Sequence, residues 1–209
     1  IKKSKYKSKI IKVDTRLKKN LINQFNNEYF SSASNIENLS FVIELAKKFN
    51  VKKKNLIKVV KRFKGLKYRQ QIIFKKRYIS IINDSKSTSY SSSIELLKRK
   101  NNIYWLIGGI PKEGDRFSLS KNKCQNIKGY IFGTNQKKFS QDLKNKINLK
   151  KFSNLSKALN ELFKDIKKDN SSRKTILFSP AAASFDTFKN FEDRGEYFNR
   201  LTKKYRSVW

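Results

Sequence analysis

The sequence predicts an α/β domain with a mostly parallel sheet, preceded by a pair of helices. Short apolar runs such as TILFSP (175–180) are typical of strands buried on both faces of a sheet. Helical stretches alternate with these runs at a spacing typical of strand–helix–strand units. The helix pair lies upstream of the runs from Gln71 onward, and Gly65 separates it from the first of these. We therefore expect one unit at 1–64 and a second at 65–209.

The first unit is predicted to be mostly helical. Residues 1–20 are basic and weakly patterned, with one short strand-like run at Ser8–Val13. From Ser34, apolar residues recur at three- and four-residue steps in SNIENLSFVIELAKKFN, which predicts an amphipathic helix. A second helix follows in KKNLIKVVKRFKG and stops at its glycine. Residues 34–64 thus form the predicted helix pair.

The second unit alternates strands with helices. The predicted strands are Gln71–Phe74, Tyr78–Ile82, Tyr104–Ile107, Gly129–Phe132 and Thr175–Phe178. The predicted helices are Ser91–Arg99, Ser140–Ile147, Ser156–Ile166 and a terminal helix that begins at Ser184. This order predicts a Rossmann-like domain whose sheet is covered by helices.

The chain carries 50 Lys and Arg against 16 Asp and Glu, a formal net charge of +34. Such an excess is typical of proteins that bind nucleic acid. The lysines are spread along the whole chain, however, and no RNA-recognition, zinc-finger or KH signature accompanies them. We interpret the charge as a compositional bias and expect no specific nucleic-acid partner. A basic nucleic-acid-binding module stays as the alternative hypothesis.

Other features of the composition narrow the class of protein. No apolar run is long enough to cross a bilayer and no signal peptide is visible, so we expect a cytoplasmic protein without a membrane partner. One cysteine and no histidine exclude an internal disulfide and a Cys/His zinc cluster, and we assign no metal ligands. The chain has no methionine, even at position 1. We interpret it as a fragment whose N-terminal part is missing.

Three loops follow predicted strands, and ligands of parallel sheets bind outside the carboxyl ends of the strands. The loops are INDSKST, GGIPKEGD and SPAAASFD. We expect all three to open on the same edge of the sheet. In the first, Asp84 suits a ribose hydroxyl and Lys86 suits a carboxylate or phosphate, although Asn-Asp-Ser is also ordinary turn chemistry.

The other two loops differ in what they indicate. GGIPKEGD is neither a GxGxxG nor a GxxxxGK[ST] motif, which argues against a dinucleotide-dependent oxidoreductase. When this loop is considered by itself, we interpret Lys112 as one more solvated lysine. In SPAAASFD, Pro180 ends a strand and the small residues leave a helix start uncovered, which predicts an anion site with Ser184 adding a hydroxyl. The alternative is that Ser184 is only an N-cap and that Phe185, Phe188 and Phe198 belong to the core, and we adopt the core assignment for Phe188 and Phe198.

These loops, in this order, resemble the C-terminal part of the Mur ligases. The resemblance rests on FKGLKYRQ, INDSKST, GGIPKEGDRF and LFSPAAASFDTFKNFEDRGEYF, and it covers about residues 30 to 209. SNIENLSFVIELA is similar to the HNxxN helix that closes the central ATPase domain of the family. The resemblance implies that residues 1–64 are the C-terminal remnant of that domain and that 65–209 are the family's Rossmann-like C-terminal domain.

The resemblance also implies an activity. Within the family, NDSKST is the mark of the members that add D-glutamate to UDP-N-acetylmuramoyl-L-alanine during synthesis of the peptidoglycan precursor. They are ATP-dependent amide ligases, in which ATP phosphorylates the carboxyl of the L-alanine and the amine of D-glutamate then attacks. We expect ATP and Mg²⁺ as cofactors, bound mainly by the missing part. We further expect a monomer, and a fragment that is inactive alone.

The resemblance assigns binding residues but no catalytic ones. The expected D-glutamate-binding residues are Lys86, Thr88, Lys112, Ser184, Phe185 and Phe191, and the expected ATP-binding residues are Asn35, Asn38, Arg69 and Asp84. The chain departs from the family pattern at four places: Ser34 replaces a histidine, Lys67–Tyr68 replaces Pro-His, Ser89 replaces an asparagine and Pro111 replaces an aspartate.

Overall fold

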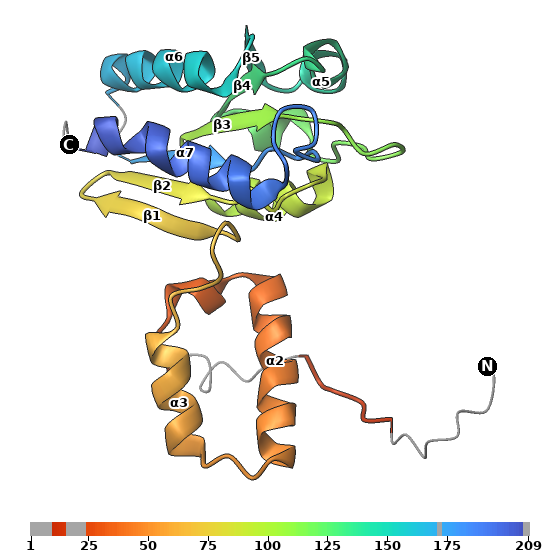
Figure 1. Ribbon diagram of the computed structural model, residues 1–209, viewed down its shortest axis with the longest axis vertical. Coiled ribbons are helices and arrows are strands. Elements are labelled where there is room, and N and C mark those ends of the chain that lie inside the picture. The colour runs from red at the N-terminus through yellow and green to blue at the C-terminus, as the bar shows by residue number, and fades with distance from the viewer. Residues whose placement is uncertain (1–9, 16–23, 171–172, 207–209) are drawn as a thin grey trace. The chain divides into compact units, whose positions relative to one another are not determined.

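The structure is a computed structural model that describes residues 10–15, 24–170 and 173–206. It divides into two compact units, Ile1–Lys64 and Gly65–Trp209 (Figure 1). Each unit has a hydrophobic core of its own.

The first unit contains a short 3-10 helix and the predicted helix pair. The elements are η1 (Glu28–Ser31), α2 (Ala33–Lys48) and α3 (Lys53–Arg62). Ser32 caps α2, because its side chain accepts a hydrogen bond from the backbone N–H of Asn35 at 3.1 Å. The core of this unit consists of Phe25, Phe30, Leu39, Ile43 and Val60. The strand expected at Ser8–Val13 is wrong over residues 10–13, which have no regular structure, and residues 8–9 lie outside the described part.

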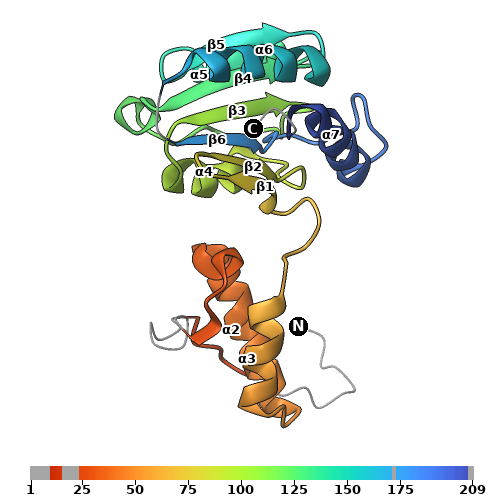
Figure 2. The same cartoon turned by 90° about the vertical axis from the view of Figure 1, so that its left-hand side faces the viewer.

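The second unit is built on a six-stranded sheet with the order β1-β2-β6-β3-β4-β5, visible from end to end in Figure 2. The strands are β1 (Gln71–Lys76), β2 (Ile79–Asn83), β3 (Ile103–Gly108), β4 (Ile127–Phe132), β5 (Asn148–Phe152) and β6 (Lys174–Phe178). β1 and β2 form an antiparallel pair, and every other pairing is parallel. The predicted mostly parallel sheet is confirmed.

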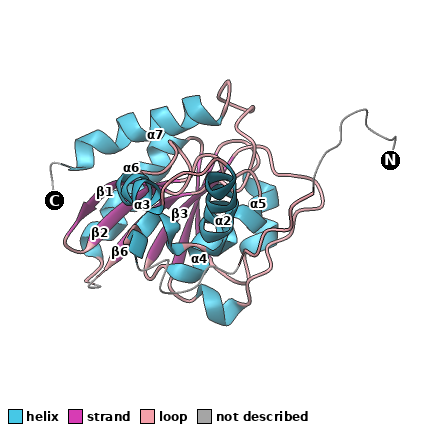
Figure 3. Cartoon of the chain, turned by 90° about the horizontal axis from the view of Figure 1, so that it is seen from below, coloured by secondary structure: helices cyan, strands magenta, loops and turns pink. Residues whose placement is uncertain are grey.

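Helices cover both faces of this sheet. They are α4 (Tyr90–Arg99), α5 (Gln136–Leu143), α6 (Leu155–Lys168) and α7 (Phe191–Arg206), with a 3-10 turn η2 at Lys121–Cys124. Successive side chains of β3 point to opposite faces of the sheet. Trp105 packs in the cluster with α4 and α5, whereas Tyr104 packs in the cluster with α6 and α7. Figure 3 shows the strands between α7 on one side and α4 on the other.

Three sequence-based expectations about these elements were wrong. β5 was not predicted, because an edge strand reading NLKKF carries polar side chains and lacks the apolar run of a buried strand. The helix expected at Ser140–Ile147 begins earlier, at Gln136, and ends at Leu143. The terminal helix begins at Phe191 and not at Ser184. Among the described residues, no helix is both long enough and apolar enough to cross a membrane.

Candidate functional site

The three predicted loops meet at one edge of the sheet, as expected. β2, β6 and β3 are neighbours and run parallel, so their carboxyl ends lie together. Asn83 at the end of β2 pairs with Phe178 at the end of β6, which pairs in turn with Leu106 of β3. The loops that follow these strands therefore start side by side.

Backbone hydrogen bonds tie the loops to one another. The N–H of Asp84 donates to the carbonyl of Phe178 at 2.7 Å, and the N–H of Gly108 donates to that of Pro180 at 3.1 Å. Ile110 and Ala183 exchange two hydrogen bonds of 2.9 Å as an isolated antiparallel bridge. The loop after β6 is thus fastened on both sides.

Lys86 and Phe191 are brought together from distant parts of the sequence. Lys86 lies in the loop after β2, and Phe191 is the first residue of α7. The Lys86 ammonium nitrogen lies 4.2 Å from the centre of the Phe191 ring, within the range of a cation–π contact. The N–H of Lys86 donates to the carbonyl of Tyr68 at 3.0 Å. This side chain is half-buried, so its charge is held at the sheet edge and remains accessible.

Asp84 is buried beneath the same loops. Its Oδ1 accepts a hydrogen bond from the N–H of Gln70 at 3.0 Å, and its Oδ2 accepts one from the hydroxyl of Ser179 at 2.9 Å. Burial raises the pKa of the Asp84 carboxyl to about 7. Asp84 therefore joins the segment before β1 to the loop after β6.

The loop after β6 differs from the expectation. Ala181 has a left-handed φ of 57°, and Ala183, two residues later, pairs with Ile110, so the chain does not enter a helix there. The carbonyl of Ser184 accepts from the N–H of Phe188 at 2.9 Å, which closes a single turn. Asn190 caps α7 through a 2.7 Å hydrogen bond from the N–H of Asp193. No helix begins at Ser184, so the helix start and the N-cap expected there are wrong, whereas ligand binding by Ser184 stays a prediction.

The remaining expected D-glutamate residues vary in exposure. Ser184 is buried, whereas Phe185 is 70% exposed beside it. Thr88 and Lys112 are exposed on the loops after β2 and β3. Of the phenylalanines expected in the core, Phe198 is fully buried and Phe188 is only half-buried.

The expected ATP-binding residues are divided between the two units. Arg69 is exposed just before β1, between Tyr68 and Gln70, which both have left-handed φ values of 61° and 48°. Asn35 and Asn38 lie in the first turns of α2 in the other unit. Asn35 is buried and donates from its side chain to the carbonyl of Tyr29 at 2.7 Å, while Asn38 is exposed.

Two departures from the family pattern have local explanations. Ser89 caps α4 in a reciprocal capping box with Ser92. The Tyr68 ring packs against Gly195, where an added Cβ would lie 2.4 Å from it, and the Tyr68 hydroxyl donates to Glu196 at 3.0 Å. The bulk of Tyr68 is therefore accommodated by the glycine of α7.

Sequence reasoning missed two residues that hold the site together. Arg194 in α7 is 0% exposed and donates hydrogen bonds to all three loops. Asn135, after β4, donates from its side chain to the carbonyl of Gly109 at 3.0 Å. Arg194 was one basic residue among many, and only its burial distinguishes it. Within the described ranges, no group of three or more metal-binding side chains is present.

Comparison with known proteins gives a consistent result. The chain is 35% identical over 179 residues to a UDP-N-acetylmuramoylalanine–D-glutamate ligase from Rickettsia felis, a match that covers 86% of this chain and 40% of the relative. It is 37% identical over 173 residues to the ligase of the same name from a Wolbachia of Brugia malayi, covering 83% of this chain and 34% of the relative. The chain thus spans well under half the length of these relatives. No protein-family model matches it.

Solved structures share the fold. The Thermotoga maritima UDP-N-acetylmuramate–alanine ligase MurC has a TM-score of 0.57 at 18% identity, over 85% of this chain and 39% of that chain. MurF from Acinetobacter baumannii has a TM-score of 0.60 at 16% identity, over 81% of this chain and 38% of that chain. Over most of its length the chain is related by sequence to Mur ligases, and it shares the fold of their solved structures.

Proposed function

We propose that the chain is the C-terminal part of an ATP-dependent ligase that adds D-glutamate to UDP-N-acetylmuramoyl-L-alanine. The observation that carries this proposal is the placement of Lys86 over Phe191 at the edge where three loops converge. The names of the relatives at 35% and 37% identity support the same activity. The nucleic-acid alternative rests on net charge alone, so we do not propose it.

In this proposal the loops at the sheet edge hold D-glutamate. Lys86 supplies a positive charge for one carboxylate, and the Phe191 ring holds the Lys86 ammonium in place by a cation–π contact. Lys112 supplies a second charge, and Thr88 and Ser184 offer hydroxyls. A hydrogen bond between a charged group and its partner contributes roughly 1.5–3 kcal/mol, so two of them can hold a small dicarboxylate.

The ATP-binding assignment fits some of the residues better than others. The exposed guanidinium of Arg69 suits a phosphate, and its neighbour Gln70 is fixed by the Asp84 carboxylate. Asp84 itself is 6% exposed and already accepts two hydrogen bonds, so a ribose hydroxyl would have to share its oxygens. ATP supplies the phosphoryl group that activates the acceptor carboxylate, whereas this chain orients the amino acid that attacks it.

The first unit supports the proposal that it is the end of a larger ATP-binding domain. The helix pair and the residue after α2 carry exposed apolar side chains, of which Phe49 is 75% exposed; the others are Phe41, Val42, Leu45 and Val59. Exposed apolar surface of this kind marks a contact with another part of a protein. The relatives extend well beyond the matched region. We propose that, in a full-length ligase, residues equivalent to that additional part cover these apolar side chains. The 209-residue chain alone would then bind but not ligate.

Binding of D-glutamate to the chain tests the proposal. Isothermal titration of the wild-type chain should show saturable binding of D-glutamate, and Lys86→Ala should weaken it by at least about 10-fold, equivalent to ~1.4 kcal/mol. Lys164→Ala is the matched control, because it removes the same charge from the exposed face of α6. Equal affinity of wild type and Lys86→Ala would remove Lys86 from the site. Ligation by the chain alone would contradict the proposal that this chain binds D-glutamate but cannot form the amide bond by itself.

A further inference from the structure

Arg194 makes an unusual set of contacts for a fully buried cation. Its Nε donates to the hydroxyl of Ser85 at 3.1 Å, and its Nη2 donates to the Ser85 carbonyl at 2.7 Å. Nη2 also donates to the carbonyl of Ala182 at 3.0 Å, and Nη1 donates to that of Gly108 at 3.3 Å. Ser85, Gly108 and Ala182 belong to three different strand–loop junctions. One side chain therefore links all three loops of the candidate site.

The burial of this charge requires an explanation. In the described part of the chain, the hydrogen-bond acceptors of Arg194 are three carbonyls and one hydroxyl, and the Asp186 carboxylate interacts with the guanidinium through its charge without accepting a hydrogen bond from it. Burial lowers the pKa of Arg194 to about 10, so the side chain remains charged at neutral pH. An apolar side chain would fill the same space without the cost of burying a charge. The planar fork of donors, which can reach several acceptors at once, is what an apolar residue lacks.

Each contact of Arg194 lies in a loop that also carries a residue assigned to D-glutamate. Ser85 directly precedes Lys86, and the Ser85 hydroxyl donates to the carbonyl of Phe191 at 2.8 Å. Ala182 lies two residues before Ser184, and Gly108 begins the loop that carries Lys112. The guanidinium thus fixes one point of each loop, and through Ser85 it also reaches the backbone of Phe191.

We propose that Arg194 is the positioning residue of the amino-acid site, holding the three loops in the arrangement in which their side chains face one ligand. The identity of that ligand, D-glutamate, rests on the proposed function. Arg194 acts through Ser85, Gly108 and Ala182 and does not itself touch the ligand. Lysine cannot replace it, because an ammonium is a point charge that cannot reach all three loops.

Two readouts on the 209-residue chain test this proposal. The first is amide hydrogen exchange without ligand, which reports local opening. Arg194→Lys and Arg194→Met should each raise exchange at least about 10-fold in residues 84–89, 108–115 and 179–190 together, with little change in α6. The second is the affinity for D-glutamate, measured at a temperature where all variants are folded. Both variants should weaken it by at least about 10-fold. Arg206→Lys, in the last turn of the same helix, is the control for both.

The outcomes separate this proposal from the proposed function. Wild-type exchange or affinity in Arg194→Lys would show that charge alone suffices and would overturn the positioning role. A uniform rise in exchange over the whole unit would overturn it too, because that is a general loss of stability. The positioning role would also be overturned if the three loops loosen while the affinity for D-glutamate stays unchanged. If the three loops loosen but the wild-type chain does not bind D-glutamate, the loop-holding role stands and the assignment of the ligand fails.

Discussion

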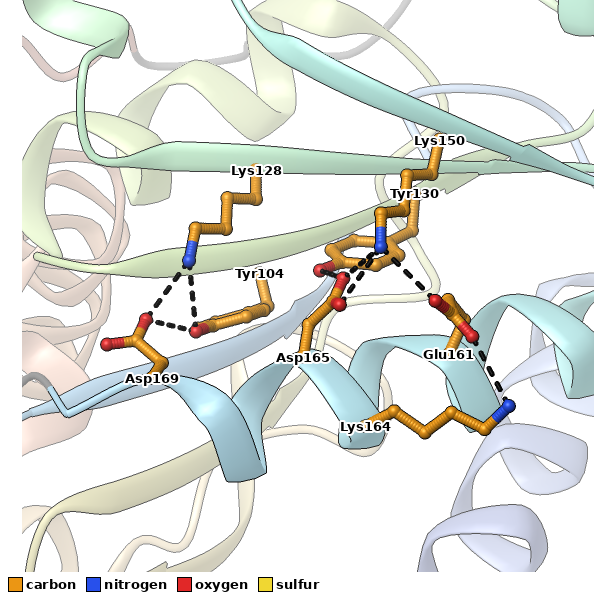
Figure 4. A network of polar contacts seen from close by, with 8 residues as sticks. All are labelled: Tyr104, Lys128, Tyr130, Lys150, Glu161, Lys164, Asp165 and Asp169. Atoms are coloured by element: carbon orange, nitrogen blue, oxygen red, sulfur yellow. Dashed lines mark hydrogen bonds and ion pairs between the residues drawn. The ribbon is translucent and has the colours of Figure 1, made fainter.

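Two polar networks in the second unit use charge in different ways. At the carboxyl edge of the sheet, the buried Arg194 guanidinium meets neutral oxygens of three loops. On the face covered by α6, half-exposed lysines meet carboxylates and tyrosine hydroxyls (Figure 4). The first network joins α7 to the chain at the ends of β2, β3 and β6, three segments that are distant in sequence. The second joins strands and a helix that backbone hydrogen bonds already fix.

The α6 network has the properties of a surface ion-pair cluster. Lys128 lies 3.1 Å from Asp169, and Lys150 lies 2.8 Å from Asp165, which also accepts from the Tyr130 hydroxyl at 2.6 Å. The side chains of Lys128 and Lys150 are 49% and 45% exposed, so water and salt screen these pairs. The comparison indicates that the number of ion pairs is a poor guide to how much a polar network stabilises the structure. Its burial and the segments that it joins matter more.

The largest effect outside Arg194 is expected at Gly195, its neighbour in α7. An alanine Cβ there would lie 2.4 Å from the Tyr68 ring, so Gly195→Ala should destabilise the unit by about 1–3 kcal/mol despite the better helix propensity of alanine. Chemical denaturation would measure the change. In a Tyr68→Ala background the same substitution should cost much less, and an equal cost in both backgrounds would contradict the packing explanation.

A pH-dependent effect is expected from Asp84. The folded-state pKa of about 7 exceeds the ordinary value, so the folded chain retains a proton that the unfolded chain has lost. Stability should therefore fall as pH rises from 5 to 7, by up to about 1.4 kcal/mol per pH unit. The chain has no histidine to obscure this change.

Thermal unfolding at pH 5 and pH 8 would test the Asp84 effect. Asp84→Asn should flatten the dependence, because the amide cannot ionise. A pH dependence that persists unchanged in Asp84→Asn would assign the effect to another group.

The smallest effect is expected in the α6 network. Lys150→Met should change the free energy of unfolding by less than about 1 kcal/mol, and 1 M salt should reduce the difference further. Denaturant titrations at two salt concentrations would measure this. A loss as large as that from Gly195→Ala would show that the ion pairs on this face matter as much as packing at the sheet edge.

The sequence predicted the parts of the molecule with strong local signals. The apolar runs of β2, β3 and β6 and the turn residues after them placed the three loops on one edge correctly. β5 was missed because its polar residues are stabilised by pairing with β4, which no local pattern reveals. The start of α7 was misplaced because the left-handed Ala181 and the bridge at Ala183 depend on contacts with another loop. Arg194 was missed for the same reason, since its partners are distant in sequence.

The most direct test of the central claim is a backbone NMR titration of the labelled 209-residue chain with D-glutamate. The account predicts saturable shifts of the amides of Lys86, Thr88 and Ser184, and weaker or no shifts with L-glutamate. The amides around Lys128 and Lys150 should not move with D-glutamate. Shifts confined to the α6 network, or identical shifts with both enantiomers, would contradict the claim that the carboxyl edge of the sheet is the D-glutamate site.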